Sequence, residues 1–226
     1  MKGGQLFKYE KERDARIAVI PRYGDVDSIK WFHIERCVTY HIMNSFEDGD
    51  EVFVRGCKAN ESILPGPDWG EDKLDWFSRG FNFKLVDSKN GKKGKETGDG
   101  MLFTSVREWR LNLETLEVKD RDVTGTEYSM DFPIINADFT GLKHQYGYTQ
   151  VIDSLASSKA GSAFVAKPEA IEEDGGWIVT FAHDEDSDTS YVLVVDAKNF
   201  GSEPIAKINL PQRVPYGFHG SFFSST

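Results

Sequence analysis

The sequence has few cysteines, no long apolar run and no excess of basic residues. Cys37 and Cys57 are the two cysteines among 226 residues. They are too few for a disulfide framework, so a reducing compartment is expected. No apolar run approaches the roughly 20 residues that a membrane helix needs. Lys and Arg number 27 against 37 Asp and Glu, a formal charge of −10. This acidic balance argues against a nucleic-acid or anionic-membrane partner, because both require concentrated positive charge.

Common catalytic motifs are missing as well. The chain has no Gly-rich phosphate loop, Gly-x-Ser-x-Gly elbow, His-Glu-x-x-His helix or Cys-x-x-Cys pair. Residues 1–16 mix both charges and lack an apolar core, so they do not form a secretory signal. They are also too acidic and too poor in serine for a transit peptide. Any chemistry must therefore come from residues scattered along the chain.

What the chain does have is material for a core and a strong β pattern. Apolar residues make up 39% and aromatic residues 13%, with 16 Phe, which excludes a disordered acidic tail. Short runs rich in Val, Ile, Phe, Trp and Tyr recur between Gly, Asp, Asn and Pro, which predicts an all-β fold. The expected strands are 16–20, 29–34, 38–46, 52–57, 101–113, 118–123, 177–183, 191–196 and 205–210.

Three pairs of these strands flank short polar turns and are predicted to form hairpins: 38–46 with 52–57, 101–113 with 118–123, and 177–183 with 191–196. Residues 71–80 have partly helical spacing, and residues 87–100, which are almost devoid of apolar side chains, read as a mobile surface loop. Strands at this spacing are typical of a sandwich, a barrel or a propeller. No exact repeat of about 40 residues stands out, so the sequence pattern does not decide among these three architectures.

The candidate functional residues are two histidines and one acid. His41 lies within an expected strand, and His219 lies between glycines near the C-terminus. A single strand histidine is more often a hydrogen-bonded core or edge residue than a metal ligand, so neither residue alone indicates a metal site. Asp131 precedes Phe132 and Pro133 in apolar surroundings, where a carboxylate needs a partner, and an imidazole N–H is one candidate.

The other polar clusters read as ordinary surface. His33, His144 and His183 have polar neighbours and no ligand spacing, so they are expected to be solvated. The acidic run at 171–177 precedes an apolar strand and contains Gly-Gly, which favours a turn over a cation site. The two cysteines are expected to be small buried or edge residues.

Several motifs in order resemble the carotenoid cleavage dioxygenase (carotenoid oxygenase) family, and in particular the C-terminal half of a plant-type member. The resemblance runs from about residue 16 to residue 223. It is carried by residues 29–32 (IKWF), 40–49 (YHIMNSFEDG), 108–113 (EWRLNL), 131–136 (DFPIIN), 163–165 (AFV), 172–177 (EEDGGW), 195–197 (VDA) and 208–220 (INLPQRVPYGFHG).

The resemblance implies part of a seven-bladed β-propeller with iron on its axis and a helical dome that shapes a tunnel for a long polyene. In the family, four histidines from different blades hold Fe(II) and leave positions open for O₂. A conjugated double bond of a carotenoid or apocarotenoid is then cleaved into two carbonyl products. Carried over to this chain, the third ligand falls on His41 and the fourth on His219. The acid that orients a ligand imidazole falls on Asp131, one methylene shorter than the usual Glu.

The sequence departs from the family pattern in three places. The first two ligand histidines belong upstream of residue 16, and no residues matching them are present. Gly161 and Ser162 stand where the family has another acid, and strand-forming sequence expected between residues 151 and 163 is missing. We therefore expect weak iron binding and little cleavage by this chain alone.

Two interpretations follow from these departures: an incomplete dioxygenase chain, or a non-catalytic propeller remnant with an interaction or structural role. A plastid, or alternatively the cytoplasm, is the expected location. Any peripheral membrane contact would belong to the missing dome.

Overall fold

The computed structural model describes residues 10, 12–60, 104–125, 128–152, 161–215, 217 and 219–224. The helix expected at 71–80 and the loop expected at 87–100 lie outside the described residues. Within them the protein is built almost entirely of antiparallel strands, with two short 3₁₀ helices, η1 (Val26–Ser28) and η2 (Ala137–Phe139). The all-β prediction is confirmed.

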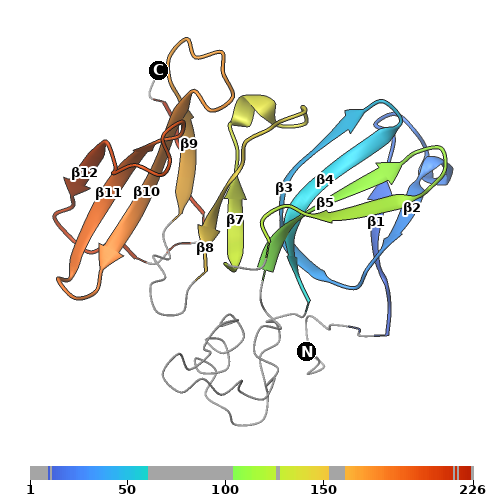
Figure 1. The fold of residues 1–226 in the computed structure, drawn as a ribbon, viewed down its shortest axis with the longest axis horizontal. Helices are drawn as coiled ribbons and strands as arrows, with labels where there is room; N and C mark the ends of the chain where they lie inside the picture. The colour runs from blue at the N-terminus through green and yellow to red at the C-terminus, as the bar shows by residue number, and fades with distance from the viewer. Residues whose placement is uncertain are drawn as a thin grey trace, which may run out of the picture.

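The strands form four sheets, and these sheets do not close into a barrel (Figure 1). A two-stranded sheet pairs β1 (Ala15–Val19) with β2 (Lys30–Ile34). A four-stranded sheet has the order β3 (Val38–Asp48), β4 (Glu51–Ala59), β5 (Thr104–Asn112) and β6 (Val118–Asp122). A second pair joins β7 (Met130–Ile134) to β8 (Tyr148–Val151). The last sheet has the order β12 (Ala206–Asn209), β11 (Thr189–Asp196), β10 (Gly176–Asp184) and β9 (Ser162–Ala166).

The three predicted hairpins are present, and the turn of the first explains its register. In β3–β4, Asp48 pairs with Glu51 around a two-residue turn. Gly49 there has φ of +62°, a left-handed conformation that glycine adopts without steric cost. β5 with β6 and β10 with β11 are likewise consecutive antiparallel pairs.

Strands β7, β8 and β9 were not expected from the sequence. They are only four or five residues long, and β7 contains Pro133 and a backbone irregularity between Asp131 and Ile134. The β7–β8 pair lies between the two four-stranded sheets in Figure 1, and β7 contacts β3, β4, β5 and β9. This short strand is therefore the junction between the two halves of the described structure.

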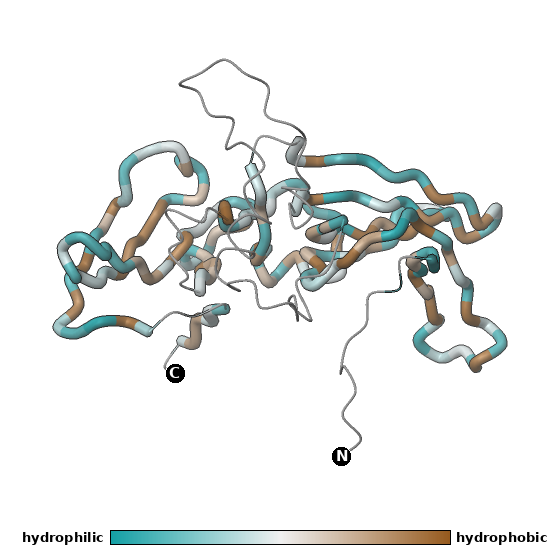
Figure 2. Tube along the Cα trace, turned by 90° about the horizontal axis from the view of Figure 1, so that it is seen from below, coloured by the Kyte–Doolittle hydropathy of each residue, from teal (hydrophilic) through white to brown (hydrophobic). Residues whose placement is uncertain are grey.

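The main core lies where β1 and β2 pack on the sheet β3–β6. Its buried side chains are Phe32, Val52, Val54, Trp109 and Leu111. Along the trace in Figure 2, hydrophobic stretches lie within the strands and the connecting turns are largely hydrophilic. The burial of these apolar side chains fixes which face of β4 and β5 points inward, and so fixes the register of the sheet.

Candidate metal centre

Two histidines and one aspartate from three distant parts of the chain lie together. His41 is on β3, Asp131 is on β7, and His219 is in the segment that follows β12. His41 Nδ1 lies 2.8 Å from Asp131 Oδ1, and His41 Nε2 lies 3.2 Å from His219 Nε2. The three residues singled out in the sequence are neighbours in space, although 178 positions separate the two histidines.

The Asp131 carboxylate determines which nitrogen of His41 carries the proton. An ionised carboxylate only accepts hydrogen bonds, so Nδ1 of a neutral His41 must be the donor. Nε2 then presents its lone pair toward His219. The expectation that Asp131 pairs with an imidazole N–H agrees with this geometry.

Asp131 is itself held by two donors, His41 and its own neighbour in the chain. It is 8% exposed, and its Oδ1 also accepts the backbone N–H of Phe132 at 2.8 Å. Burial raises the pKa of the Cys57 thiol strongly, and the nearby negative charge of Asp131 raises it further. The thiol therefore remains protonated at neutral pH.

His41 lies where the pairing of β3 with β4 is irregular. The register shifts between Thr39 and Ile42 and again between Ile42 and Asn44. Such bulges redirect side chains and occur preferentially beside functional sites. Opposite them, a side chain on Gly56 of β4 would be tightly placed, because a Cβ there would lie 2.9 Å from Ile42 Cδ1 and 3.1 Å from the His41 carbonyl oxygen. The bulge and this glycine together set the position of the imidazole.

Phe132 covers both imidazoles from β7. Its ring centroid lies 5.0 Å from that of His41 and 5.6 Å from that of His219. Its φ is +54°, a left-handed conformation that a bulky side chain rarely adopts. Backbone strain of this kind costs on the order of 1–3 kcal/mol and concentrates at functional sites. The sequence carried no signal for it, since neither the φ angle nor the ring's partners follow from local pattern.

The two Nε2 atoms suit a shared metal ion. Imidazole nitrogens bind first-row divalent metals at about 2.1 Å, so two such bonds from one ion span any separation up to about 4.2 Å. The observed 3.2 Å separation lies well inside that limit. Within the described ranges, no group of three or more His, Cys, Asp or Glu side chains is placed to hold a metal ion. The described residues thus offer a pair of donors.

A buried polar network ties the β7 side of the site to β3. Asn44, three residues after His41, receives the Gly141 backbone N–H on its side-chain oxygen at 2.9 Å. Its amide nitrogen lies 3.0 Å from His144 Nδ1. Arg55 Nη1 donates to the His144 carbonyl oxygen at 2.8 Å and lies 3.2 Å from its Nε2. The loop before β8 is thereby fastened to the strand that carries His41.

This network corrects the interpretation of His144 as a solvated residue. His144 is 4% exposed, and burial together with the charge of Arg55 lowers its pKa. His183 is a second correction, because its side chain is 6% exposed and lies 2.9 Å from Ser190 Oγ and 3.1 Å from Arg213 Nε. His33 is exposed as expected. In both corrected cases the chain folds a distant segment over the ring, which local polarity does not reveal.

Near the start of β9, Ser162 Oγ donates a hydrogen bond to Thr180 Oγ1 at 2.9 Å, across the β9–β10 pair. In the acidic turn at 171–177, the Glu173 carboxylate accepts the backbone N–H groups of Gln145 and Tyr146. Both cysteines are free, with Cys57 buried and Cys37 half-buried, as expected.

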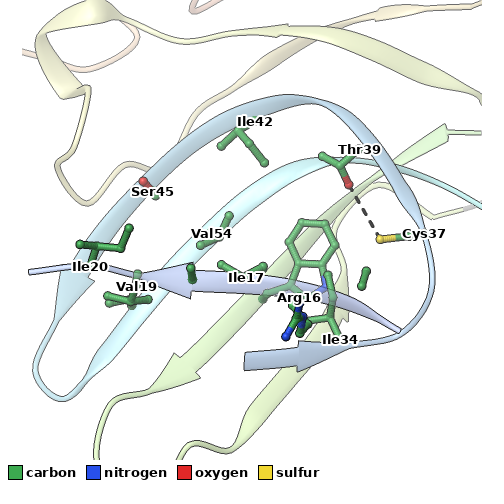
Figure 3. A pocket seen from close by; sticks show the side chains of 14 residues that line it. Arg16, Ile17, Val19, Ile20, Ile34, Cys37, Thr39, Ile42, Ser45 and Val54 are labelled. Atoms are coloured by element: carbon green, nitrogen blue, oxygen red, sulfur yellow. Dashed lines mark hydrogen bonds between the residues drawn. The ribbon is translucent and has the colours of Figure 1, made fainter. Parts of the chain in front are cut away.

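A separate apolar cavity of about 530 Å³ lies between β1 and the sheet β3–β5 (Figure 3). Its walls include Ile17, Val19, Ile42 and Val54. Trp109 is also a lining residue, and its buried Nε1 has no hydrogen-bond partner among the described residues. The histidine pair does not line this cavity, so the cavity belongs to the core rather than to the candidate metal centre.

Comparison with known proteins places this chain in a family. The model of the retinal pigment epithelial membrane protein family matches residues 1–163 and 157–224. The chain belongs to this family. Carotenoid 9,10(9′,10′)-cleavage dioxygenases are among its similar relatives, with 31% identity for the Crocus sativus protein and 30% for one from Arabidopsis thaliana. The sequence resemblance to carotenoid cleavage dioxygenases is confirmed.

Solved structures share the fold of this chain. Cobalt-substituted Synechocystis ACO matches with a TM-score of 0.72 at 18% identity, over 96% of this chain and 46% of that chain. A mutant of Synechocystis ACO matches with a TM-score of 0.73 at 19% identity, with the same coverage. These matches confirm the prediction of a partial β-propeller.

The chain spans less than half the length of the two carotenoid 9,10(9′,10′)-cleavage dioxygenases. It covers 43% of the Crocus sativus protein and 42% of the Arabidopsis thaliana protein. The first of these alignments extends over 262 positions, more than this chain has residues. The relative therefore has internal segments without a counterpart here. In the described part of the chain, no helix is both long and apolar enough to cross a membrane.

Proposed function

We propose that this chain supplies part of the iron centre of a dioxygenase that cleaves a carotenoid or apocarotenoid with O₂. His41 and His219 are the proposed ligands of Fe(II), and Asp131 is the acid that orients His41. The reaction divides one conjugated C=C bond into two C=O groups, each of which takes one atom of O₂. Family membership and the names of the relatives support the reaction class.

The observation that carries the proposal is the convergence of the two Nε2 atoms at 3.2 Å with a carboxylate behind one of them. A carboxylate on the far nitrogen of a ligand histidine fixes its tautomer and ring orientation and makes the ligating nitrogen more basic. An accidental contact between two surface histidines would not require this buried acid. The donor set suits Fe(II) among other first-row metals, and the family resemblance selects iron.

When bound, the iron supplies open coordination positions at which O₂ is activated. The residues of this chain do the remaining work. Asp131 holds the His41 proton at Nδ1, so the Nε2 lone pair is available. Phe132 contacts both rings, and an aromatic side chain there suits an apolar polyene.

Two histidines supply half of the four that the family resemblance implies. We therefore propose that the isolated 226-residue chain binds iron weakly and turns over little substrate. Some plant relatives are named chloroplastic, which supports a plastid location over the cytoplasm. We propose that any contact with a membrane surface is made by the helical dome that the family resemblance implies.

The proposal is tested by metal titration of the purified chain with Fe(II) under anaerobic conditions. His41→Ala and His219→Ala should each weaken the tightest binding step at least tenfold, and the double variant should add little, because the two residues act on one ion. His33→Ala is the matched control, since His33 is exposed and lies outside the pair. Equal Fe(II) affinity in the parent chain and in all four variants would reject the metal site.

The second candidate is a propeller remnant with an interaction or structural role. The observation that favours it is that the chain covers only 43% of the Crocus sativus relative. The two functions separate in a cleavage assay with Fe(II), O₂ and an apocarotenoid. Carbonyl products that disappear in the His41→Ala variant support the enzyme. Stable folding without products in any metal condition supports the remnant.

A further inference from the structure

The histidine pair depends on a backbone contact at Gly161, which precedes β9. An ideal Cβ built on Gly161 would lie 2.1 Å from the carbonyl carbon of His219, 2.2 Å from its oxygen and 2.3 Å from the nitrogen of Gly220. All three atoms belong to the main chain, so no side-chain rotation can relieve the overlap. Every residue other than glycine at position 161 must push the His219 backbone away.

His219 has few other supports of this kind. It lies outside the strands and 3₁₀ helices among the described residues. Gly161, in contrast, adjoins a fixed element, because Ser162 pairs with Thr180 in the β9–β10 ladder and bonds to its hydroxyl. The rigid side of the contact is therefore the sheet, and the movable side is the segment that carries His219.

From these contacts we infer that Gly161 is a positioning residue for His219: because it has no side chain, the His219 backbone can lie directly against it. The inference rests on the proposed function, because it concerns the geometry of the proposed ligand pair. The absence of a side chain at position 161 lets the two backbones touch.

The size of the effect follows from the distances. Ordinary van der Waals contact begins near 3.4 Å, so a Cβ at 2.1 Å must move the His219 carbonyl by more than 1 Å. Metal sites keep their bond lengths within about 0.2 Å, and designed sites fail when ligands shift by about 0.5 Å. A shift above 1 Å separates His219 Nε2 from the ion that His41 holds. We expect a loss of Co(II) affinity of about tenfold or more, the range seen when a ligand loses its support.

Three glycines at this contact form a graded series. Gly161→Ala creates the severe overlap. Gly220→Ala creates a tight contact, with its Cβ 3.0 Å from the Gly161 carbonyl carbon and oxygen. Gly217→Ala is the matched control from the same segment, because its Cβ would meet only the Gly161 nitrogen at 3.8 Å. The expected order of disturbance is Gly161→Ala, then Gly220→Ala, with Gly217→Ala indistinguishable from the parent chain.

Two measurements on the 226-residue chain test the inference. The first is the nuclear Overhauser effect between the ring Hε1 protons of His41 and His219 in metal-free protein labelled at histidine. The second is Co(II) affinity by calorimetry. Gly161→Ala should abolish the ring contact and weaken Co(II) binding while the amide signals of β10 and β11 remain in place. A general folding defect would move those signals as well.

The outcomes separate this inference from the proposed function. If Gly161→Ala loses the ring contact and no protein binds Co(II), Gly161 positions His219 but the pair is not a metal site. If Gly161→Ala keeps the ring contact and its Co(II) affinity stays within twofold of the parent chain, Gly161 does not position His219. If Gly161→Ala does not fold, Gly220→Ala decides. An intermediate loss of ring contact supports the inference, and behaviour identical to Gly217→Ala overturns it.

Discussion

Replacing Asp131 by Asn should weaken metal binding more than it weakens the fold. The carboxylate accepts the His41 Nδ1–H at 2.8 Å and the Phe132 N–H at the same distance, and it is 8% exposed. An Asn side chain has nearly the same shape but no charge, and its amide nitrogen donates rather than accepts. Both hydrogen bonds go to Oδ1, so the Asn oxygen can keep them while its NH₂ group takes the place of the second carboxylate oxygen.

The magnitudes of the two effects differ. Hydrogen bonds to charged groups contribute about 1.5–3 kcal/mol. Because the side-chain oxygen of Asn can still accept the His41 proton, we expect a loss of about 1–2 kcal/mol in the free energy of unfolding. Removing the partner of a ligand histidine typically lowers metal affinity 10- to 100-fold, and we expect a value in that range for Asp131→Asn. Metal binding is more sensitive because it depends on the basicity and direction of a single nitrogen.

The assay compares Co(II) affinity by calorimetry with urea unfolding of the same metal-free proteins. Asp186→Asn, which neutralises an exposed turn residue, controls for the change in net charge. Asp131→Glu keeps the charge on a longer arm and should retain more affinity than Asn. If Asp131→Asn binds Co(II) as tightly as the parent chain while Asp131→Glu does not, the charge is irrelevant and the reasoning fails.

Three further predictions concern the scaffold of the site. Glu108→Gln should lower the free energy of unfolding by about 2–3 kcal/mol in urea titrations. Glu108 is fully buried and accepts a hydrogen bond at 2.8 Å from Nε of Arg55, whose guanidinium is itself mostly buried. An unchanged free energy of unfolding would contradict this prediction. The pKa values of His144 and Glu108 are lowered in the fold, so the unfolded chain takes up protons before the folded chain does. The free energy of unfolding should be level between pH 6.5 and the alkaline range in which the unfolded Cys57 thiol ionises, fall as the pH drops below 6.5 and fall again below about 4.5. A His144→Gln chain should lack the step below pH 6.5. Cys57 should resist iodoacetamide at pH 8 until the chain unfolds, because burial and Asp131 raise its pKa, and rapid labelling of folded protein would place the thiol in a different environment.

The sequence predicted the outer architecture well because most strands carry their own signal. Alternating apolar residues and turn glycines such as Gly49 fix hairpins locally, so β3, β4, β10 and β11 were found to within a few residues. β7 escaped because Phe132 and Pro133 break the alternation. Its importance comes from contacts with β3 and β9, which are long-range and leave no trace in a five-residue window.

The site was predicted in part, and for reasons that differ from residue to residue. Asp131 stood out as an acid in apolar surroundings, and that observation alone suggested an imidazole partner. The pairing of His41 with His219 came from family resemblance, since 178 intervening positions carry no spacing signal. His144 was misjudged because Lys143 and Gln145 made its neighbourhood look polar, whereas the fold places Asn44 and Arg55 against the ring.

The local costs at the site argue that the fold itself holds the histidine pair. Phe132 has a left-handed backbone, and strain of this kind costs on the order of 1–3 kcal/mol. The contacts of β7 with β3 and β9 offset this cost, and the bulged strand β3 and the close approach at Gly161 limit where the two histidines can lie. A ligand pair held in this way loses little conformational entropy when it binds. We therefore expect that further histidine ligands added beside the pair would raise the metal affinity without rearranging His41 or His219.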